Sequence, residues 1–80
     1  MKAYVLIKFD PKADLSKASH ALAEPGVETM DLVLGNWDAI ACIVADDMVS
    51  LSRLSTKIRN CPGIRDSVTY PVVPVESISG

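Results

Sequence analysis

The segment Gly35-Asn36-Trp37-Asp38 holds the side chains best suited to chemistry in this 80-residue chain. Gly35-Asn36 is typical of a hairpin turn, and Gly35 would let a ligand approach the backbone closely. The Asp38 carboxylate beside that turn could receive the ammonium group of an amino acid through a charge-assisted hydrogen bond. The alternative is that Gly35-Asn36 is only a turn and that Asp38 satisfies donors of the turn or of another subunit.

The remaining reactive side chains indicate neither catalysis nor a metal centre. His20 is the sole histidine, and no cysteine or second histidine stands at ligand spacing from it. Cys42 and Cys61 lack the C-x-x-C spacing, and both fit small buried hydrophobic positions. We therefore expect no cofactor, no metal, and reduced thiols in a cytoplasmic protein.

Composition narrows the class of partner. The net charge is −2, and there is no basic run, which argues against direct nucleic-acid binding. The first apolar segment, residues 3–9, is too short to span a membrane. Hydrophobic residues make up 49% of the sequence, more than so small a domain can bury alone. These numbers favour a single domain that forms oligomers.

One short motif, Pro-Gly followed by an apolar residue, occurs twice and predicts the architecture that positions the hairpin. Pro25-Gly26-Val27 and Pro62-Gly63-Ile64 each follow a helix-like segment and precede a strand-like run. Proline stops a helix, and glycine supplies a tight or left-handed turn at little steric cost. The same helix-ending Pro-Gly turn in both halves indicates two copies of strand–helix–strand.

The elements expected between these turns complete the pattern. Strands are predicted at 3–9, 27–34, 37–45 and 64–73. A first helix opens at Asp10-Pro11 with the apolar stripe Leu15, Ala18 and Leu22. A second is capped by Asp46 or Asp47 and carries the stripe Leu51, Leu54 and Ile58.

The order βαββαβ is that of a ferredoxin-like α+β fold. It gives a four-stranded antiparallel sheet with both helices on one face. A single domain over 1–80 is expected, with residues 74–80 as a loose tail.

The third predicted strand carries apolar residues on both of its faces. Trp37, Ala39, Ala41 and Ile43 alternate with Asp38, Ile40, Cys42 and Val44. A sheet with one wet face should alternate apolar with polar residues, so both faces are expected to be covered. The helices cover one, and we infer that a second subunit covers the other, sheet on sheet.

Five segments follow one another along the chain: Pro25-Gly-Val, Val33-Leu-Gly-Asn-Trp-Asp38, Asp46-Asp-Met48, Ile58-x-x-x-Pro62-Gly-Ile64 and Thr69-Tyr70. With these segments the sequence resembles the C-terminal effector domain of the Lrp/AsnC transcriptional regulators, the RAM domain (regulation of amino acid metabolism). The resemblance runs over roughly residues 3–76.

This resemblance implies a dimeric α/β barrel that assembles further into tetramers or octamers and binds small effectors, typically amino acids, between dimers. It also implies that Asp38, its neighbouring loop, Met48 and Tyr70 influence the effector response. From the residues alone, Met48 also fits a flexible core filler, and Tyr70 an amphipathic ring at a dimer seam. Pro71 requires a sheet edge, a bulge or a strand end, because proline lacks the ladder donor.

Three functions are compatible with these features. The first is a stand-alone amino-acid or metabolite sensor in transcriptional regulation, expected because full-length family members carry an N-terminal DNA-binding domain and this sequence starts at the first strand with Met1-Lys2. It could co-assemble with a full-length Lrp/AsnC regulator or act as a metabolite-responsive partner of an enzyme. The second is a small dimeric α/β-barrel enzyme that uses Asp38 and Tyr70. The third is a purely structural oligomerisation module.

Overall fold

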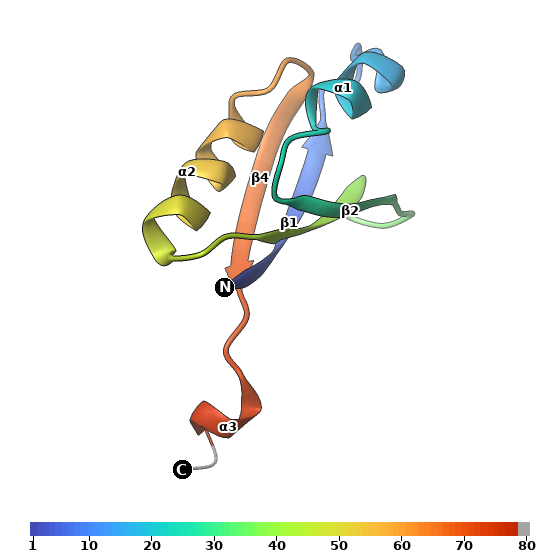
Figure 1. Cartoon of the computed structure of the whole chain (residues 1–80). Coiled ribbons are helices and arrows are strands. Elements are labelled where there is room, and N and C mark those ends of the chain that lie inside the picture. Colours follow the sequence, from blue (N-terminus) through green and yellow to red (C-terminus); the bar gives the residue numbers. More distant parts are fainter. Residues whose placement is uncertain (79–80) are drawn as a thin grey trace.

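A computed structural model describes residues 1–78 of the chain. The elements are β1 (Lys2–Phe9), α1 (Leu15–Ala21), β2 (Val27–Leu32), β3 (Ala39–Val44), α2 (Met48–Arg59), β4 (Ile64–Pro71) and α3 (Val75–Ile78). Figure 1 shows α3 at the end of a tail that extends away from the sheet. The predicted βαββαβ order is confirmed, and the short helix α3 was not predicted.

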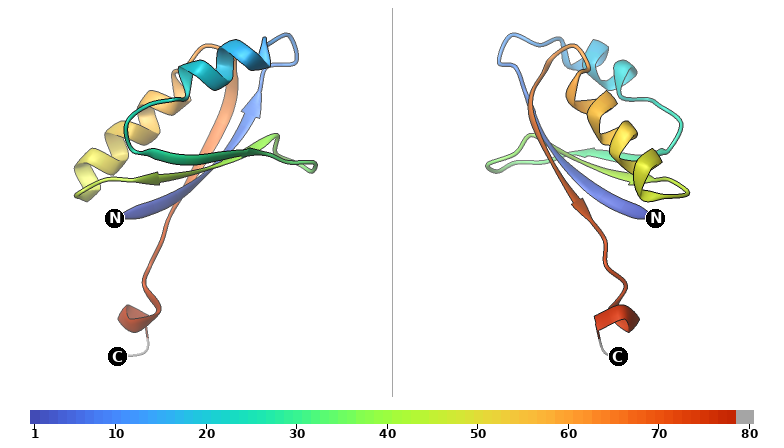
Figure 2. Two further views of the ribbon diagram at one scale, coloured as in Figure 1. Left: turned by 45° about the vertical axis from the view of Figure 1, so that its right-hand side comes forward. Right: turned by 90° about the vertical axis from the view of Figure 1, so that its left-hand side faces the viewer.

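The four strands form one sheet in the order β2-β3-β1-β4, and every neighbouring pair is antiparallel. Both α1 and α2 lie on the same side of this sheet (Figure 2). The predicted ferredoxin-like α+β fold is therefore confirmed. Pro71 is the last residue of β4, which is an edge strand. The backbone N–H that proline lacks is therefore not needed for hydrogen bonds between inner strands.

The repeated Pro-Gly motif has the same role in both halves of the chain. Gly26 and Gly63 both adopt a positive φ, of 97° and 88°, which favours glycine. The Gly26 carbonyl accepts a hydrogen bond from the Val44 N–H, and the Gly63 carbonyl accepts one from the Asp10 N–H, each at 2.8 Å. Each glycine thus turns the chain and ties the turn to a segment distant in sequence.

Helix α1 begins later than the sequence predicted. The Asp10 carboxylate accepts a hydrogen bond from the Lys12 N–H at 2.9 Å, a local turn that delays the helix. Asp14 is the N-cap and accepts from the backbone N–H groups of the first turn. Leu15 is 48% exposed, so the predicted stripe is wrong at this residue, because α1 enters the core only through Ala18 and the C-cap Leu22. Ala18 and Leu22 are buried as expected.

Helix α2 follows the prediction closely. Of the two candidate caps, Asp47 is the N-cap, and its carboxylate accepts a hydrogen bond from the Ser50 N–H at 2.7 Å. Leu51 and Ile58 are buried, and Leu54 is partly buried against the core. The apolar stripe of α2 is therefore confirmed.

Three strands end or begin inside their predicted bounds. β2 stops at Leu32 and β3 starts at Ala39, because residues 33–38 form a hairpin loop closed by a hydrogen bond from the Val33 N–H to the Asp38 carbonyl. β4 stops at Pro71 rather than at residue 73. Trp37 and Asp38 consequently lie in the hairpin and not in the third strand.

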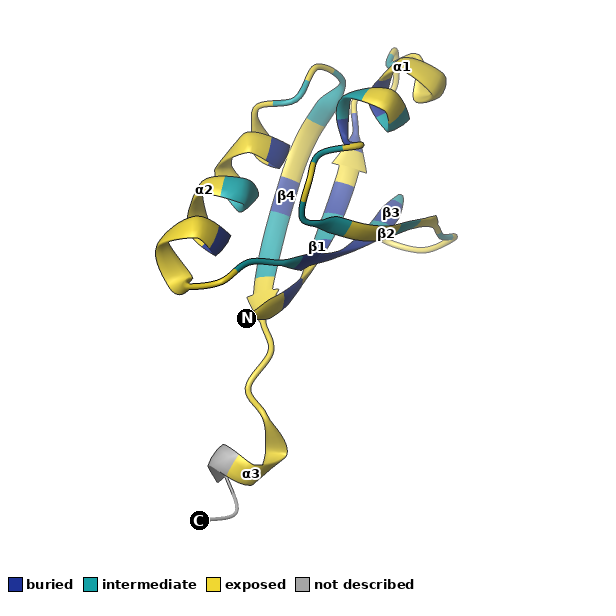
Figure 3. Cartoon of the chain, in the orientation of Figure 1, coloured by how far each residue is buried: buried dark blue, intermediate teal, exposed yellow. Residues whose placement is uncertain are grey.

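Buried residues alternate with more exposed ones along β1 (Figure 3), so the two faces of the sheet differ in burial. Paired residues of neighbouring strands share a face, so the register assigns each side chain. The face under the helices holds the core residues Ala3, Val5, Ile7, Phe9, Ala39, Ala41 and Ile43, all of them buried. The opposite face, called the open face below, carries Lys2, Tyr4, Leu6, Lys8, Ile40, Cys42, Val44, Asp66, Val68 and Tyr70.

Candidate functional site

Asp38 fastens the hairpin to the end of β1. Its Oδ2 atom accepts a hydrogen bond from the Phe9 N–H at 2.9 Å, and its own N–H donates to the Ile7 carbonyl at 2.9 Å. These contacts agree with the alternative named in the sequence analysis, in which Asp38 has the structural role of satisfying hydrogen-bond donors. A carboxylate can accept several hydrogen bonds, so the bond to Phe9 does not exhaust the acceptor capacity of Asp38.

A pocket of about 420 Å³ lies beside this carboxylate. It is formed where the hairpin, the end of β1 and the start of α1 meet, and is called the hairpin pocket below. Its lining residues are Phe9, Asp10, Pro11, Ala13, Leu15, Leu32, Val33, Leu34 and Asp38. The walls are mainly apolar, and two carboxylates supply the charge. This arrangement could hold a small cation with an apolar side chain, because the carboxylates would bind the charged end.

The tip of the hairpin projects into open space. Leu34 is fully exposed, and a Cβ atom added to Gly35 would meet no heavy atom within 4 Å. Asn36 is also exposed, whereas the half-buried Trp37 ring has the Lys8 ammonium 5.9 Å from its centroid. Within one chain Gly35 is therefore not required for close packing, and the exposed tip is available to another molecule.

Met48 and Tyr70 lie apart from the hairpin. Met48 is half-exposed at the first residue of α2. Tyr70 is on the open face, where it pairs with Tyr4 near the start of β1. Asp38 binds Phe9 at the far end of the same strand, five residues away, or roughly 17 Å along the strand. One chain therefore brings Gly35, Asn36, Trp37 and Asp38 together, but it does not bring Met48 or Tyr70 to them.

A second hollow, which the sequence analysis missed, runs between α2 and β4. This α2–β4 groove has a volume of about 480 Å³. Its lining residues are Met48, Leu51, Ser52, Ser55, Thr56, Arg59, Ser67, Val68, Thr69 and Pro71. The signal was available, because Ser52, Ser55 and Arg59 recur at helical spacing, and Ser67 and Thr69 alternate on β4.

The chain matches the family model described as the Lrp/AsnC ligand binding domain over residues 2–76. This match covers nearly the whole sequence. The chain belongs to the Lrp/AsnC ligand-binding domain family.

Three comparisons place this Lrp/AsnC domain among known proteins. It is 31% identical over 71 residues to an uncharacterized HTH-type transcriptional regulator of Pyrococcus horikoshii, covering 84% of this chain and 47% of the relative. The chain thus spans about half the length of the curated relative that it matches. The crystal structure of hypothetical protein PHS023 from Pyrococcus horikoshii is 25% identical, with a TM-score of 0.76, and covers 91% of this chain and 90% of that one.

A third relative shares the fold at lower identity. It is a transcriptional regulator from Neisseria meningitidis in complex with L-Met, 17% identical with a TM-score of 0.81. The match covers 91% of this chain and 49% of that regulator. At this identity the likeness shows the fold alone. Among residues 1–78 of the Lrp/AsnC domain, no helix is long and apolar enough to cross a membrane.

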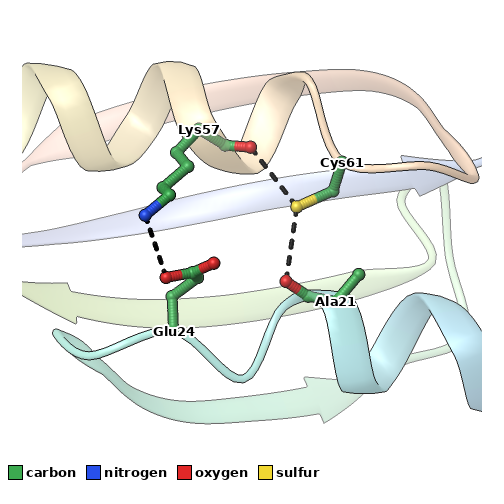
Figure 4. A network of polar contacts seen from close by, with 4 residues as sticks. All are labelled: Ala21, Glu24, Lys57 and Cys61. Atoms are coloured by element: carbon green, nitrogen blue, oxygen red, sulfur yellow. Dashed lines mark hydrogen bonds and ion pairs between the residues drawn. The ribbon is translucent and has the colours of Figure 1, made fainter.

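The cysteines of this Lrp/AsnC domain have structural surroundings. Figure 4 shows Cys61 between the ends of α1 and α2, with its Sγ atom 3.4 Å from the Ala21 carbonyl oxygen and 3.3 Å from that of Lys57. Lys57 also forms an ion pair with Glu24 at 3.1 Å. Burial, followed by the nearby Glu24 charge, raises the pKa of the Cys61 thiol, which keeps it protonated and unreactive at neutral pH. Cys42 is buried on the open face.

Proposed function

We propose that this chain is an effector-sensing module in transcriptional regulation, which binds an amino acid or a related small metabolite and does not contact DNA itself. The observation that carries the proposal is the Lrp/AsnC ligand-binding match over residues 2–76. The net charge of −2 supports a sensing role rather than a DNA-binding role.

The hairpin pocket is the proposed effector site. The Asp38 carboxylate would receive the ammonium group of the amino acid, and the apolar walls from Phe9 and Leu32 would contact its side chain. A fold relative from Neisseria meningitidis is described as a complex with L-Met, which supports an amino acid as the class of ligand. The exposed hairpin tip, with Leu34, Gly35 and Asn36, would close on the ligand from a neighbouring subunit.

Assembly would complete this site. Met48 and Tyr70 are separated from Asp38 within one chain, so their proposed effect on the response requires a second copy. The open face supports a sheet-on-sheet homodimer, because Leu6, Ile40 and Val68 form an apolar centre that neither α1 nor α2 covers. Co-assembly with a full-length Lrp/AsnC regulator through the same face would link the sensor to transcription.

A catalytic role is less well supported. The enzyme hypothesis needs Asp38 and Tyr70 in one site, but they bind to opposite ends of β1. The relatives described above as regulators supply no catalytic precedent. We therefore propose that the chain is not an enzyme.

Thermal unfolding against each of the twenty amino acids tests the proposed function. A ligand that binds the native state at a hundredfold excess over its dissociation constant stabilises it by about 2.7 kcal/mol, which raises the midpoint by several degrees. We expect one or a few amino acids to act, and Asp38→Asn to abolish the response because it keeps an acceptor for Phe9 but loses the charge.

Asp46→Asn is the matched control for that experiment. Asp46 is exposed in the turn before α2, outside both the hairpin pocket and the open face, so its substitution should leave the response intact. A flat response to all twenty amino acids from a folded oligomer would contradict amino-acid sensing and favour the structural module. An equal loss in Asp46→Asn and Asp38→Asn would contradict the hairpin pocket as the site.

A further inference from the structure

The α2–β4 groove differs in charge from the rest of this acidic chain. Arg59 is the only charged residue among its lining residues, and no carboxylate lines it. The chain as a whole carries a net charge of −2. A groove whose single charge is a guanidinium attracts anions, and the planar fork of arginine matches a carboxylate.

The wall of the groove that β4 forms is polar, although the rest of the covered face is apolar. On β1 and β3, the residues that face the helices are apolar, whereas β4 presents Ser67 and Thr69 on that face. Ser67 is 1% exposed, and it is the buried polar residue of the described core. Burying a hydroxyl is unfavourable without a hydrogen bond, so these residues need polar partners.

Helix α2 supplies those partners. The Arg59 Nη2 atom donates to the Ser67 carbonyl at 2.9 Å, and its Nε atom lies 3.4 Å from the Ser67 hydroxyl. The Ser55 hydroxyl bonds to that of Thr69. A guanidinium has five donors, and each hydroxyl has one donor and two lone pairs. These contacts therefore orient Arg59 and Ser55 toward β4 and leave them able to bind a ligand.

We propose that the α2–β4 groove is a binding site for a small hydroxycarboxylate, separate from the hairpin pocket. The Arg59 guanidinium binds the carboxylate. Ser55 lies four residues earlier on the same helical face, about 6 Å along the axis, so its hydroxyl meets a ligand hydroxyl two or three carbons from the carboxylate.

An NMR titration of the ¹⁵N-labelled protein with 3-hydroxybutyrate tests this site. We expect the backbone amide signals of Ser52, Ser55, Ser67 and Thr69 to shift, and those of residues 33–38 to remain. The uncharged analogue 1,3-butanediol has the same carbon chain and should bind at least about tenfold more weakly, because hydrogen bonds to charged groups are the stronger ones.

Matched variants on one helix assign the site to its residues. Arg59→Gln should weaken binding of 3-hydroxybutyrate by about tenfold or more, whereas Arg53→Gln, the same change at an exposed position of α2 outside this groove, should not. If Arg59→Gln fails to fold because Ser67 loses its partner, Ser52→Leu replaces it. Ser52 is an exposed lining residue, and a leucine there fills the groove without removing a core contact.

Three results would overturn the hydroxycarboxylate site. They are the absence of any shift at millimolar 3-hydroxybutyrate, equal weakening by Arg53→Gln and Arg59→Gln, and shifts confined to residues 33–38. The last result would still support the hairpin pocket, so failure of this site is distinguishable from failure of the proposed function.

Discussion

The two faces of the sheet have different compositions, although they share the same strands. Val5 and Ile7 of β1 point under the helices and are fully buried, whereas Tyr4 on the same strand is 42% exposed on the open face. The covered face is apolar on β1 and β3, but the open face mixes an apolar centre with Lys2, Lys8 and Asp66 at its ends. This difference indicates that one face holds the monomer together and that the other is suited to assembly.

The sharpest test of this comparison is a pair of truncations on neighbouring residues of β1. Ile7→Ala should lower the free energy of unfolding by about 2–5 kcal/mol, because it leaves a cavity in the core. Leu6→Ala on the open face should cost less when the protein is dilute enough to be monomeric. Urea unfolding at low concentration measures both, and equal losses would contradict the assignment of the core to the covered face.

The turn that leads from α1 to β2 gives the next largest effect. Gly26→Ala places a Cβ atom 2.7 Å from Leu54 Cδ2 and 3.0 Å from the Val44 carbonyl, at a φ of +97°. We expect a destabilisation of about 1–3 kcal/mol from strain and displaced packing. Gly35→Ala is the control, because its Cβ meets open space. A thermal midpoint for Gly26→Ala that equals that of Gly35→Ala would show that the turn tolerates a side chain.

A charge in the apolar centre of the open face tests its role in assembly. Leu6→Lys should weaken self-association by about tenfold or more, because an unpaired ammonium would be buried between two sheets, while the monomer still folds. Sedimentation velocity measures the association, and circular dichroism checks the fold. Unchanged association in a folded Leu6→Lys protein would exclude the centre of this face from the interface.

The smallest expected effect is the pH dependence of the α2 cap, which lies outside both faces. Hydrogen bonds from Ser50, first the backbone N–H and then the side chain, hold the pKa of Asp47 below its ordinary value of 3.8. Because the folded pKa is lowered, the cap stabilises the fold above the ordinary pKa, and this stabilisation is lost as pH falls through the folded value.

Thermal midpoints at neutral and acidic pH measure that contribution. The thermal midpoint of Asp47→Asn should fall less on acidification than that of the wild type, since asparagine caps the helix without a titrating charge. Asp46→Asn, at the neighbouring position that does not cap α2, should follow the wild-type profile. Asp47 is not the titrating cap if acidification lowers the thermal midpoint less in Asp46→Asn than in the wild type, and equally in Asp47→Asn and the wild type.

The fold was largely predictable because its signals are local and repeated. Two Pro-Gly turns, two apolar helix stripes and β-rich runs determine the element order without any long-range information. The errors also have local causes. The side-chain turn at Asp10 delayed α1, and the bond between Val33 and Asp38 extended the hairpin loop into both predicted strands.

The site was less predictable, because it depends on contacts between distant segments. The sequence singled out Asp38, but it did not reveal the bond to Phe9 or the pocket that α1 closes beside it. The α2–β4 groove depends on how α2 is placed over β4, which helical spacing alone does not define. Met48 and Tyr70 came from family resemblance, and a single chain does not unite them with Asp38.

We propose that the covered face makes the fold and that the open face makes the assembly in which the effector site is completed. Sedimentation velocity of the wild-type chain at micromolar concentration tests this claim most directly. We predict a species of at least twice the mass of one chain, which Leu6→Lys dissociates. A wild-type protein that sediments as a single chain at every concentration would contradict it.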